Sequence, residues 1–92
     1  MPIETFHFDI AEHLKTDEDI REFLKETAIT GDASYFIHAL NIATRAKGMT
    51  EIAKQTGVSR ASLYKSLSDS GNPRFDTIIK IVNALGCKIA IA

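Results

Sequence analysis

Apolar side chains recur at helical spacing near the start of the chain, over residues 17–29. A spacing of three and four residues places one face of a helix toward a core, and the residues on that face are Ile20, Phe23, Leu24, Thr27 and Ala28. Thr16 precedes the stretch as an N-cap, and the carboxylates at 17–19 suit the positive end of the helix dipole. Gly31 then interrupts the pattern, so we predict a helix over 17–29.

The next stretch, residues 33–47, is apolar around most of its circumference. Asp32 is placed to cap it, and Lys47 followed by Gly48 is typical of a helix C-terminus. A helix with only a narrow polar stripe belongs at the centre of a domain. We therefore expect this helix to be surrounded by the others.

Three shorter helices are predicted after it, at about 50–56, 60–68 and 75–85. Gly57 ends the first and Ser59 caps the second, while a loop dense in turn residues, 68–73, precedes the third. The third helix carries an apolar face made of Phe75, Ile78, Ile79, Val82 and Leu85.

Both ends of the chain alternate polar and apolar residues with the period of a strand. These segments, about 4–9 and 87–91, are predicted as short terminal strands. With 92 residues the chain is expected to form one domain over 1–92. The predicted fold class is therefore all-α, five helices flanked by two short strands.

Residues 49–68 have the spacing of a helix-turn-helix. A small residue lets the two helices cross closely, a glycine takes the left-handed conformation of the turn, and apolar residues anchor both helices to the core. The residues in these roles are Ile52, Ala53, Gly57, Val58 and Leu63. Such a motif can insert its second helix into the DNA major groove, although the same corner also occurs as plain scaffolding.

The stretch GMTEIAKQTGVSRASLYKSLSDSGNPRFDTIIKIVNALGCKI resembles the lambda-repressor-like (Xre) helix-turn-helix domain. More narrowly, with FDIAEHLKTDEDIREFLKETAITGD at the front, nearly the whole chain is similar to the probable addiction-module antidote proteins, which are HigA-like antitoxins. Two features depart from the wider repressor pattern: the segment from Gly48 to Ala53 is two residues shorter, and Ser66 occupies a position that is normally apolar.

The side chains expected at DNA lie around the start of the second helix of the motif. Arg60 matches the acceptors of guanine or a phosphate, Ser62 can donate to either, and Ala61 can contact a thymine methyl group. Phosphate contacts are expected from residues before, within and after this helix, namely Thr50, heading the preceding helix as its cap, Tyr64, Lys65, Asn72 and Arg74.

Charge is distributed unevenly along the chain. Residues 1–43 carry a formal charge of −6, whereas residues 44–80 carry +4. So few basic residues predict weak DNA binding by one copy, and hence a homodimer that reads two half-sites about one turn apart. The two terminal strands could form that dimer by pairing across subunits, or could pair with each other within one chain.

The resemblance implies an antitoxin that represses its own operon and neutralises a small basic toxin of the RelE/ParE type. The acidic first half suits such a toxin. A stand-alone transcriptional regulator and a protein-binding adaptor are the alternatives.

No catalytic, metal or cofactor site is expected, because the three histidines lack the spacing and the Cys or carboxylate neighbours of a metal site. The single cysteine, Cys87, and the absence of a secretion signal or an apolar segment long enough to span a bilayer indicate a cytoplasmic protein. The protein is not expected to be an enzyme, because the sequence contains no phosphate-binding Gly-rich loop and no nucleophile elbow.

Overall fold

The computed structural model describes residues 9–68 and 71–91 and contains five α-helices. They are α1 (Asp17–Ile29), α2 (Ala33–Lys47), α3 (Met49–Thr56), α4 (Arg60–Ser66) and α5 (Phe75–Ala84), preceded by the 3-10 helix η2 (Ile10–His13). The predicted bounds of α1 and α2 are confirmed, and those of the shorter helices differ by one or two residues. The mainly helical class is likewise confirmed.

Local sequence explains why the two long helices begin where they do. The Thr16 hydroxyl accepts a hydrogen bond from the Asp19 amide at 3.0 Å, and the Asp19 carboxylate accepts one from the Thr16 amide at 3.2 Å. This capping box satisfies donors that have no partner inside a helix. At the start of α2, Asp32 accepts from the Tyr35 amide at 3.1 Å.

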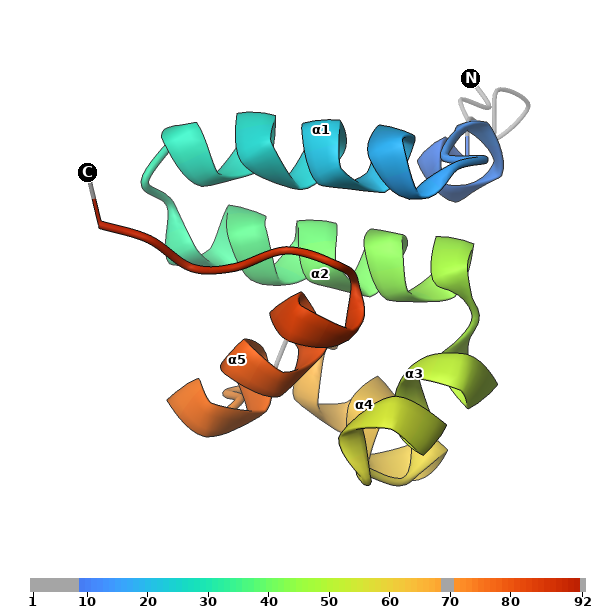
Figure 1. The fold of residues 1–92 in the computed structure, drawn as a ribbon. Coiled ribbons are helices and arrows are strands. Elements are labelled where there is room, and N and C mark those ends of the chain that lie inside the picture. The colour runs from blue at the N-terminus through green and yellow to red at the C-terminus, as the bar shows by residue number, and fades with distance from the viewer. Residues whose placement is uncertain (1–8, 69–70, 92) are drawn as a thin grey trace, which may run out of the picture.

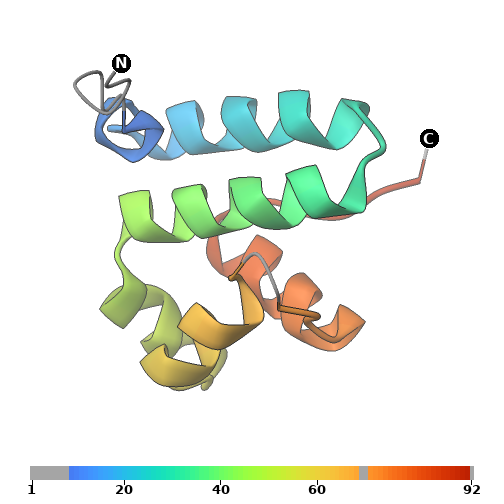
Figure 2. The ribbon, with the colours of Figure 1, turned by 180° about the vertical axis from the view of Figure 1, so that it is seen from behind.

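Helix α2 lies between α1 on one side and the group α3–α5 on the other (Figures 1 and 2). Five of its residues are buried, including Leu40 and Ala43 at 0% exposure, so the predicted central position is confirmed. The core is one cluster to which all five helices contribute. It includes Ile20 and Leu24 from α1 and Ile81 and Val82 from α5. This arrangement supports the two short helices α3 and α4 at one edge of the molecule.

The predicted strand at 87–91 is absent. Residues 87–91 form an extended tail that runs beside α2 and ends near the loop between α1 and α2 (Figure 1). A strand needs a hydrogen-bonded partner, and no strand is present among residues 9–68 and 71–91. The predicted strand at 4–9 lies outside the described residues apart from Asp9, which caps η2.

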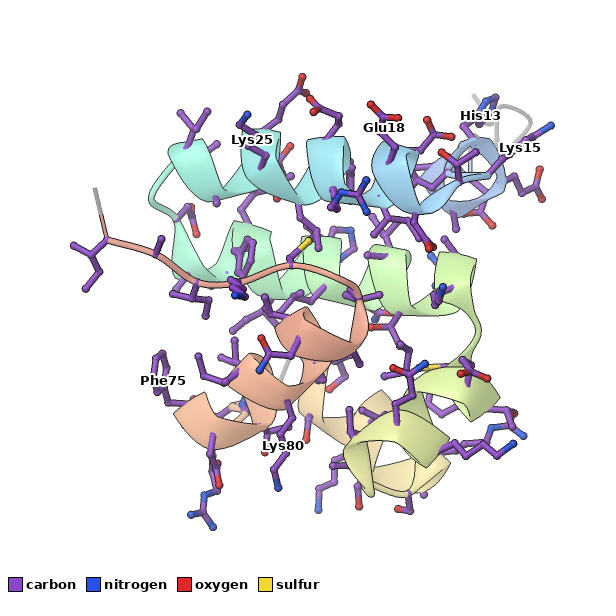
Figure 3. The ribbon with its side chains drawn as sticks, viewed as in Figure 1. His13, Lys15, Glu18, Lys25, Phe75 and Lys80 are labelled. Atoms are coloured by element: carbon purple, nitrogen blue, oxygen red, sulfur yellow. The ribbon has the colours of Figure 1, made fainter. Side chains whose placement is uncertain are left out.

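The apolar face predicted for α5 was partly wrong. Phe75 is 69% exposed, whereas Ile81, which was left out of that face, is fully buried. The reason is position: Phe75 is the first residue of α5 and projects away from the rest of the molecule (Figure 3), while Ile81 lies in the half of α5 that packs into the core.

Candidate nucleic-acid interface

Helices α3 and α4 are joined by three residues, Gly57 to Ser59, and we call this unit the α3–α4 corner. Gly57 ends α3 in the left-handed region, with φ 76° and ψ 7°, and its amide donates to the Ala53 carbonyl at 2.9 Å. A Cβ at Gly57 would meet no atom within 4 Å. Glycine is therefore favoured here by backbone conformation and not by lack of space.

Apolar side chains hold both helices of the corner to the core. Ile52 of α3 and Leu63 of α4 are each 0% exposed, and Val58 in the turn packs partly buried against the same cluster. Ala53 is partly buried as well. Of the five residues predicted as the framework of a helix-turn-helix, two are buried, two are partly buried and Gly57 lies in the turn, while their role in such a motif stays a prediction.

Thr56 fastens the turn itself, a role that the sequence analysis missed. Its hydroxyl donates to the Ile52 carbonyl at 2.8 Å and accepts from the Val58 amide at 3.2 Å. One side chain therefore links the last turn of α3 to the segment that leads into α4. A threonine near a helix end, two residues before an apolar residue, is the signal that would have suggested it.

The first turn of α4 is exposed. The Ser59 hydroxyl accepts from the Ser62 amide at 3.1 Å and donates to the Ser62 hydroxyl oxygen at 3.0 Å. In this arrangement the proton of Ser62 remains available for an outside acceptor. Arg60 and Ala61 are exposed beside it, so we call residues Arg60, Ala61 and Ser62 the leading edge of α4.

All eight residues predicted to contact DNA are exposed: Thr50, Arg60, Ala61, Ser62, Tyr64, Lys65, Asn72 and Arg74. One detail differs from prediction. Thr50 does not cap α3, because that helix begins one residue earlier and Gly48 occupies its N-cap without a side-chain hydrogen bond. Thr50 is instead an exposed residue of the first turn.

The loop that carries Asn72 and Arg74 is pressed against the end of α4. A Cβ at Gly71 would lie 2.4 Å from the Ser66 carbonyl oxygen and 2.5 Å from that of Lys65. No side chain fits at such a distance, so Gly71 brings this loop next to α4. The sequence predicted only that Gly71 lies in a turn-rich loop.

A second contact fixes the end of α4 to the central helix. The Asn41 side-chain amide of α2 donates to the Leu67 carbonyl at 3.0 Å. Leu67 directly follows α4 and is 1% exposed. Asn41 thus positions α4 from 26 residues away in sequence, a link that the helical pattern gave no reason to expect.

Two cations of the basic half, residues 44–80, are already held in ion pairs. Arg45 lies 3.6 Å from Asp9, and Lys47 donates to Asp17 at 2.9 Å. The hydrogen bond and charge of Lys47 hold the pKa of the Asp17 carboxyl below its ordinary value. These two cations are therefore engaged with the acidic half.

The remaining cations of the basic half are nearer to the corner. Four of them form no ion pair within the part of the chain that the structure describes: Lys54, Arg60, Lys65 and Lys80. Lys80 lies on the side of the molecule opposite to Lys15 and Glu18 (Figure 3). Arg74 is 3.4 Å from Asp76, and its side chain is 84% exposed. Unpaired cations on the same side as an exposed helix edge are suited to phosphate groups.

Comparison with known proteins supports one part of the resemblance noted in the sequence, the similarity to probable addiction module antidote proteins. Residues 4–92 match the family model described as "Probable addiction module antidote protein". A protein of Haemophilus influenzae, named only "Uncharacterized protein", is 39% identical over 84 residues, which span 91% of this chain and 87% of that one. No solved structure matches. None of the helices among the described residues is long and apolar enough to cross a membrane. The match over nearly the whole length shows that the chain belongs to the family of probable addiction module antidote proteins.

Proposed function

We propose that this chain is the antitoxin of a type II toxin–antitoxin pair, and that it binds the operator of its own operon through the α3–α4 corner. In this proposal the corner is a helix-turn-helix in a lambda-repressor-like, HigA-like domain, and α4 is its recognition helix. The protein acts in the cytoplasm, where both the operator and the toxin are found.

The observation that carries the DNA-binding role is the exposure of the leading edge of α4 beside a buried anchor. Leu63 is 0% exposed, whereas Arg60 to Ser62 are exposed. The core thus holds the helix by one face and leaves the other free to enter a major groove.

Each exposed side chain has a definite role in this proposal. Arg60 has paired donors that match guanine or span a phosphate, Ser62 has a free hydroxyl proton, and Ala61 has a methyl group for contact with thymine. Lys65, Tyr64 and Thr50 bind phosphates on the near side. Asn72 and Arg74 bind the flanking backbone, because Gly71 holds their loop against the end of α4.

A homodimer is part of the proposal for energetic reasons. Since Arg45 and Lys47 are already paired with carboxylates, few cations remain to displace counterions from DNA. One copy would therefore bind weakly, with a shallow dependence on salt. Two copies on a near-palindrome double the number of contacts.

The toxin is proposed to be small and basic, of the RelE/ParE type, and to bind the acidic half. Helix α1 exposes Glu18, Glu22 and Glu26, which recur every four residues along one side. Carboxylates arranged in this way attract a basic partner and orient its approach.

A gel-shift titration on the promoter region of the chain's own operon tests the DNA-binding role. We expect Arg60→Ala with Ser62→Ala to raise the dissociation constant by about 100-fold, because each good base contact is worth about 1–3 kcal/mol. Lys15→Ala is the matched control: it also removes an exposed cation, but on the opposite side of the molecule (Figure 3). Equal affinities for the double variant and the control would refute the assignment of α4.

The toxin is tested separately, by co-purification with the product of the adjacent gene. Retention by the wild-type chain and loss on replacing Glu18, Glu22 and Glu26 with Gln are expected. No complex with the wild-type chain would leave a stand-alone regulator as the better description.

A further inference from the structure

An apolar groove of about 820 Å³ lies at the end of the molecule away from the α3–α4 corner. It is bounded by the second half of α1, the start of α2 and the tail, and its apolar lining includes Leu24, Ala28, Phe36 and Val82. Ile29, also in the lining, is 79% exposed, and Ile91 at the end of the tail is 98% exposed. Apolar surface gathered in this way on a small chain marks a binding surface.

The tail beside this groove has unused backbone groups. The Cys87 amide donates to the Val82 carbonyl at 3.0 Å, but residues 88–91 make no backbone hydrogen bond with any described residue. Their backbone is extended and their odd-numbered side chains, Ile89 and Ile91, are apolar. An extended segment of this kind is a ready partner for another strand.

The charges around the groove indicate which partner fits. Its lining includes three cations, Arg21, Lys25 and Lys88, and no carboxylate. A basic toxin would be repelled there, whereas an acidic surface would be attracted. A second copy of this chain offers such a surface in its acidic half, which exposes Glu12 and Asp32 in addition to the carboxylates assigned to the toxin. In a two-fold interface each contact occurs twice, because residue i of one copy meets residue j of the other and the reverse.

We propose that two copies pair through their tails, antiparallel about a two-fold axis at Ile89, and that each tail helps to cover the groove of the other copy. The inference rests on the proposed function only in that a dimer is required there. It identifies the surface that forms the dimer, on the side of the molecule that leaves α4 free.

The register follows from the side chains of the tail. With Ile89 opposite Ile89, each Ile91 lies opposite the partner's Cys87, and each Lys88 lies opposite the partner's Ala90. Cys87, Ile89 and Ile91 of both copies then share one face of the ribbon. Shifting the axis to residue 88 would place two lysines directly opposite each other, which is unfavourable.

Sedimentation equilibrium of the full chain and three variants tests the interface. Ile89→Asp is expected to raise the dimer dissociation constant about 100-fold, because two carboxylates would be buried between apolar side chains. Ala90→Asp faces the partner's Lys88 and is expected to bind several-fold more tightly than Ala90→Lys, since opposite charges across a pair attract. A monomeric wild-type chain, or equal weakening by all three variants, would overturn the inference.

Cross-linking tests the register directly. Directly opposite residues of antiparallel strands have Cα atoms about 4.5–5.5 Å apart, within the range that a disulfide spans. In a Cys87→Ser background, Ile89→Cys should form a disulfide-linked dimer faster than Lys88→Cys. The two thiols at residue 88 would not lie directly opposite each other, because each faces residue 90 of the other copy. Faster cross-linking of Lys88→Cys would overturn the register.

Two comparisons separate this inference from the proposed function. If the wild-type chain is monomeric but retards the operator duplex in the gel-shift titration, the proposed pairing of the tails is wrong and the DNA-binding role stands. If the wild-type chain is monomeric and Ile89→Asp abolishes toxin binding, the groove belongs to the toxin and the inference is again overturned. If Ile89→Asp abolishes the dimer and Arg60→Ala keeps it, the inference is supported, whether or not the chain binds the operator.

Discussion

Helices α1 and α4 both begin at a capping hydroxyl, but their first turns carry opposite charges. In α1, Thr16 is joined by three carboxylates at residues 17–19, and Asp19 completes a capping box. In α4, Ser59 is followed by Arg60 and the first turn has no acidic residue. Carboxylates at that position would stabilise the helix but would repel phosphates. The start of α1 is arranged for stability, and that of α4 is suited to an anionic partner.

The two helices also differ in what keeps them folded. Helix α1 has 13 residues and α4 has 7, and so short a helix is not stable alone. Its conformation depends on contacts from other elements: Leu63 in the core, Asn41 at its end and Gly71 against its last turn. The substitutions below test this dependence, from the largest expected effect to the smallest.

Removing the anchor of α4 should have the largest effect. Leu63→Ala is expected to lower the free energy of unfolding by about 3 kcal/mol, because it leaves a cavity in the core. Tyr64→Ala is the matched control: its side chain is 48% exposed and should cost less than about 1 kcal/mol. Urea unfolding followed by circular dichroism measures both, and equal losses would mean that α4 is not held through Leu63.

The two glycines beside α4 should respond differently to substitution. Gly71→Ala meets backbone oxygens and is expected to cost about 2 kcal/mol, whereas Gly57→Ala strains only the backbone and should cost about 1 kcal/mol. Asn tolerates the left-handed region, so Gly57→Asn should recover part of the loss and Gly71→Asn should recover none. Thermal melts of the four variants would contradict this account if Asn helped at both positions.

A buried hydroxyl in α2 should be dispensable. Thr44 is 0% exposed and its hydroxyl has no hydrogen-bond partner among the residues that the structure describes, so Thr44→Val should raise stability by about 1 kcal/mol. Thr27 of α1 is also buried, but its hydroxyl donates to the Leu24 carbonyl at 2.9 Å. Thr27→Val should therefore give no gain, and a similar gain at both positions would show that the hydrogen bond makes no difference.

The smallest effect is expected at the exposed start of α1. Because Lys47 lowers the pKa of Asp17 below 3.8, the ionised carboxylate stabilises the fold above that pH, and this contribution is lost as the pH falls through the lowered pKa. Asp17→Asn should thus melt slightly below wild type at pH 7, and the gap should close in strong acid. In a Lys47→Met background, which lacks the partner of Asp17, the same substitution should open a smaller gap, and an equal gap in both backgrounds would contradict this account.

Features set by neighbouring residues were predictable from the sequence. The bounds of α1 and α2 follow from Thr16, Asp32 and the glycines after each helix, and the spacing around Gly57 predicted the α3–α4 corner. What could not be predicted depends on how the helices cross. The Lys47–Asp17 pair joins residues 30 apart, and the approach of Gly71 to Ser66 leaves no trace in periodicity. The tail was predicted as a strand because its polar and apolar residues alternate. Alternation does not show whether a hydrogen-bonded partner strand is present.

The central claim is that α4, and not α1, meets DNA, and the amide spectrum of the ¹⁵N-labelled chain titrated with its operator duplex tests it most directly. The account predicts that the largest shifts fall on Arg60 to Lys65, with smaller shifts at Thr50 and Asn72, while the exposed amides of Glu18 to Glu26 stay in place. Shifts concentrated on α1, with the amides at the start of α4 unmoved, would contradict it.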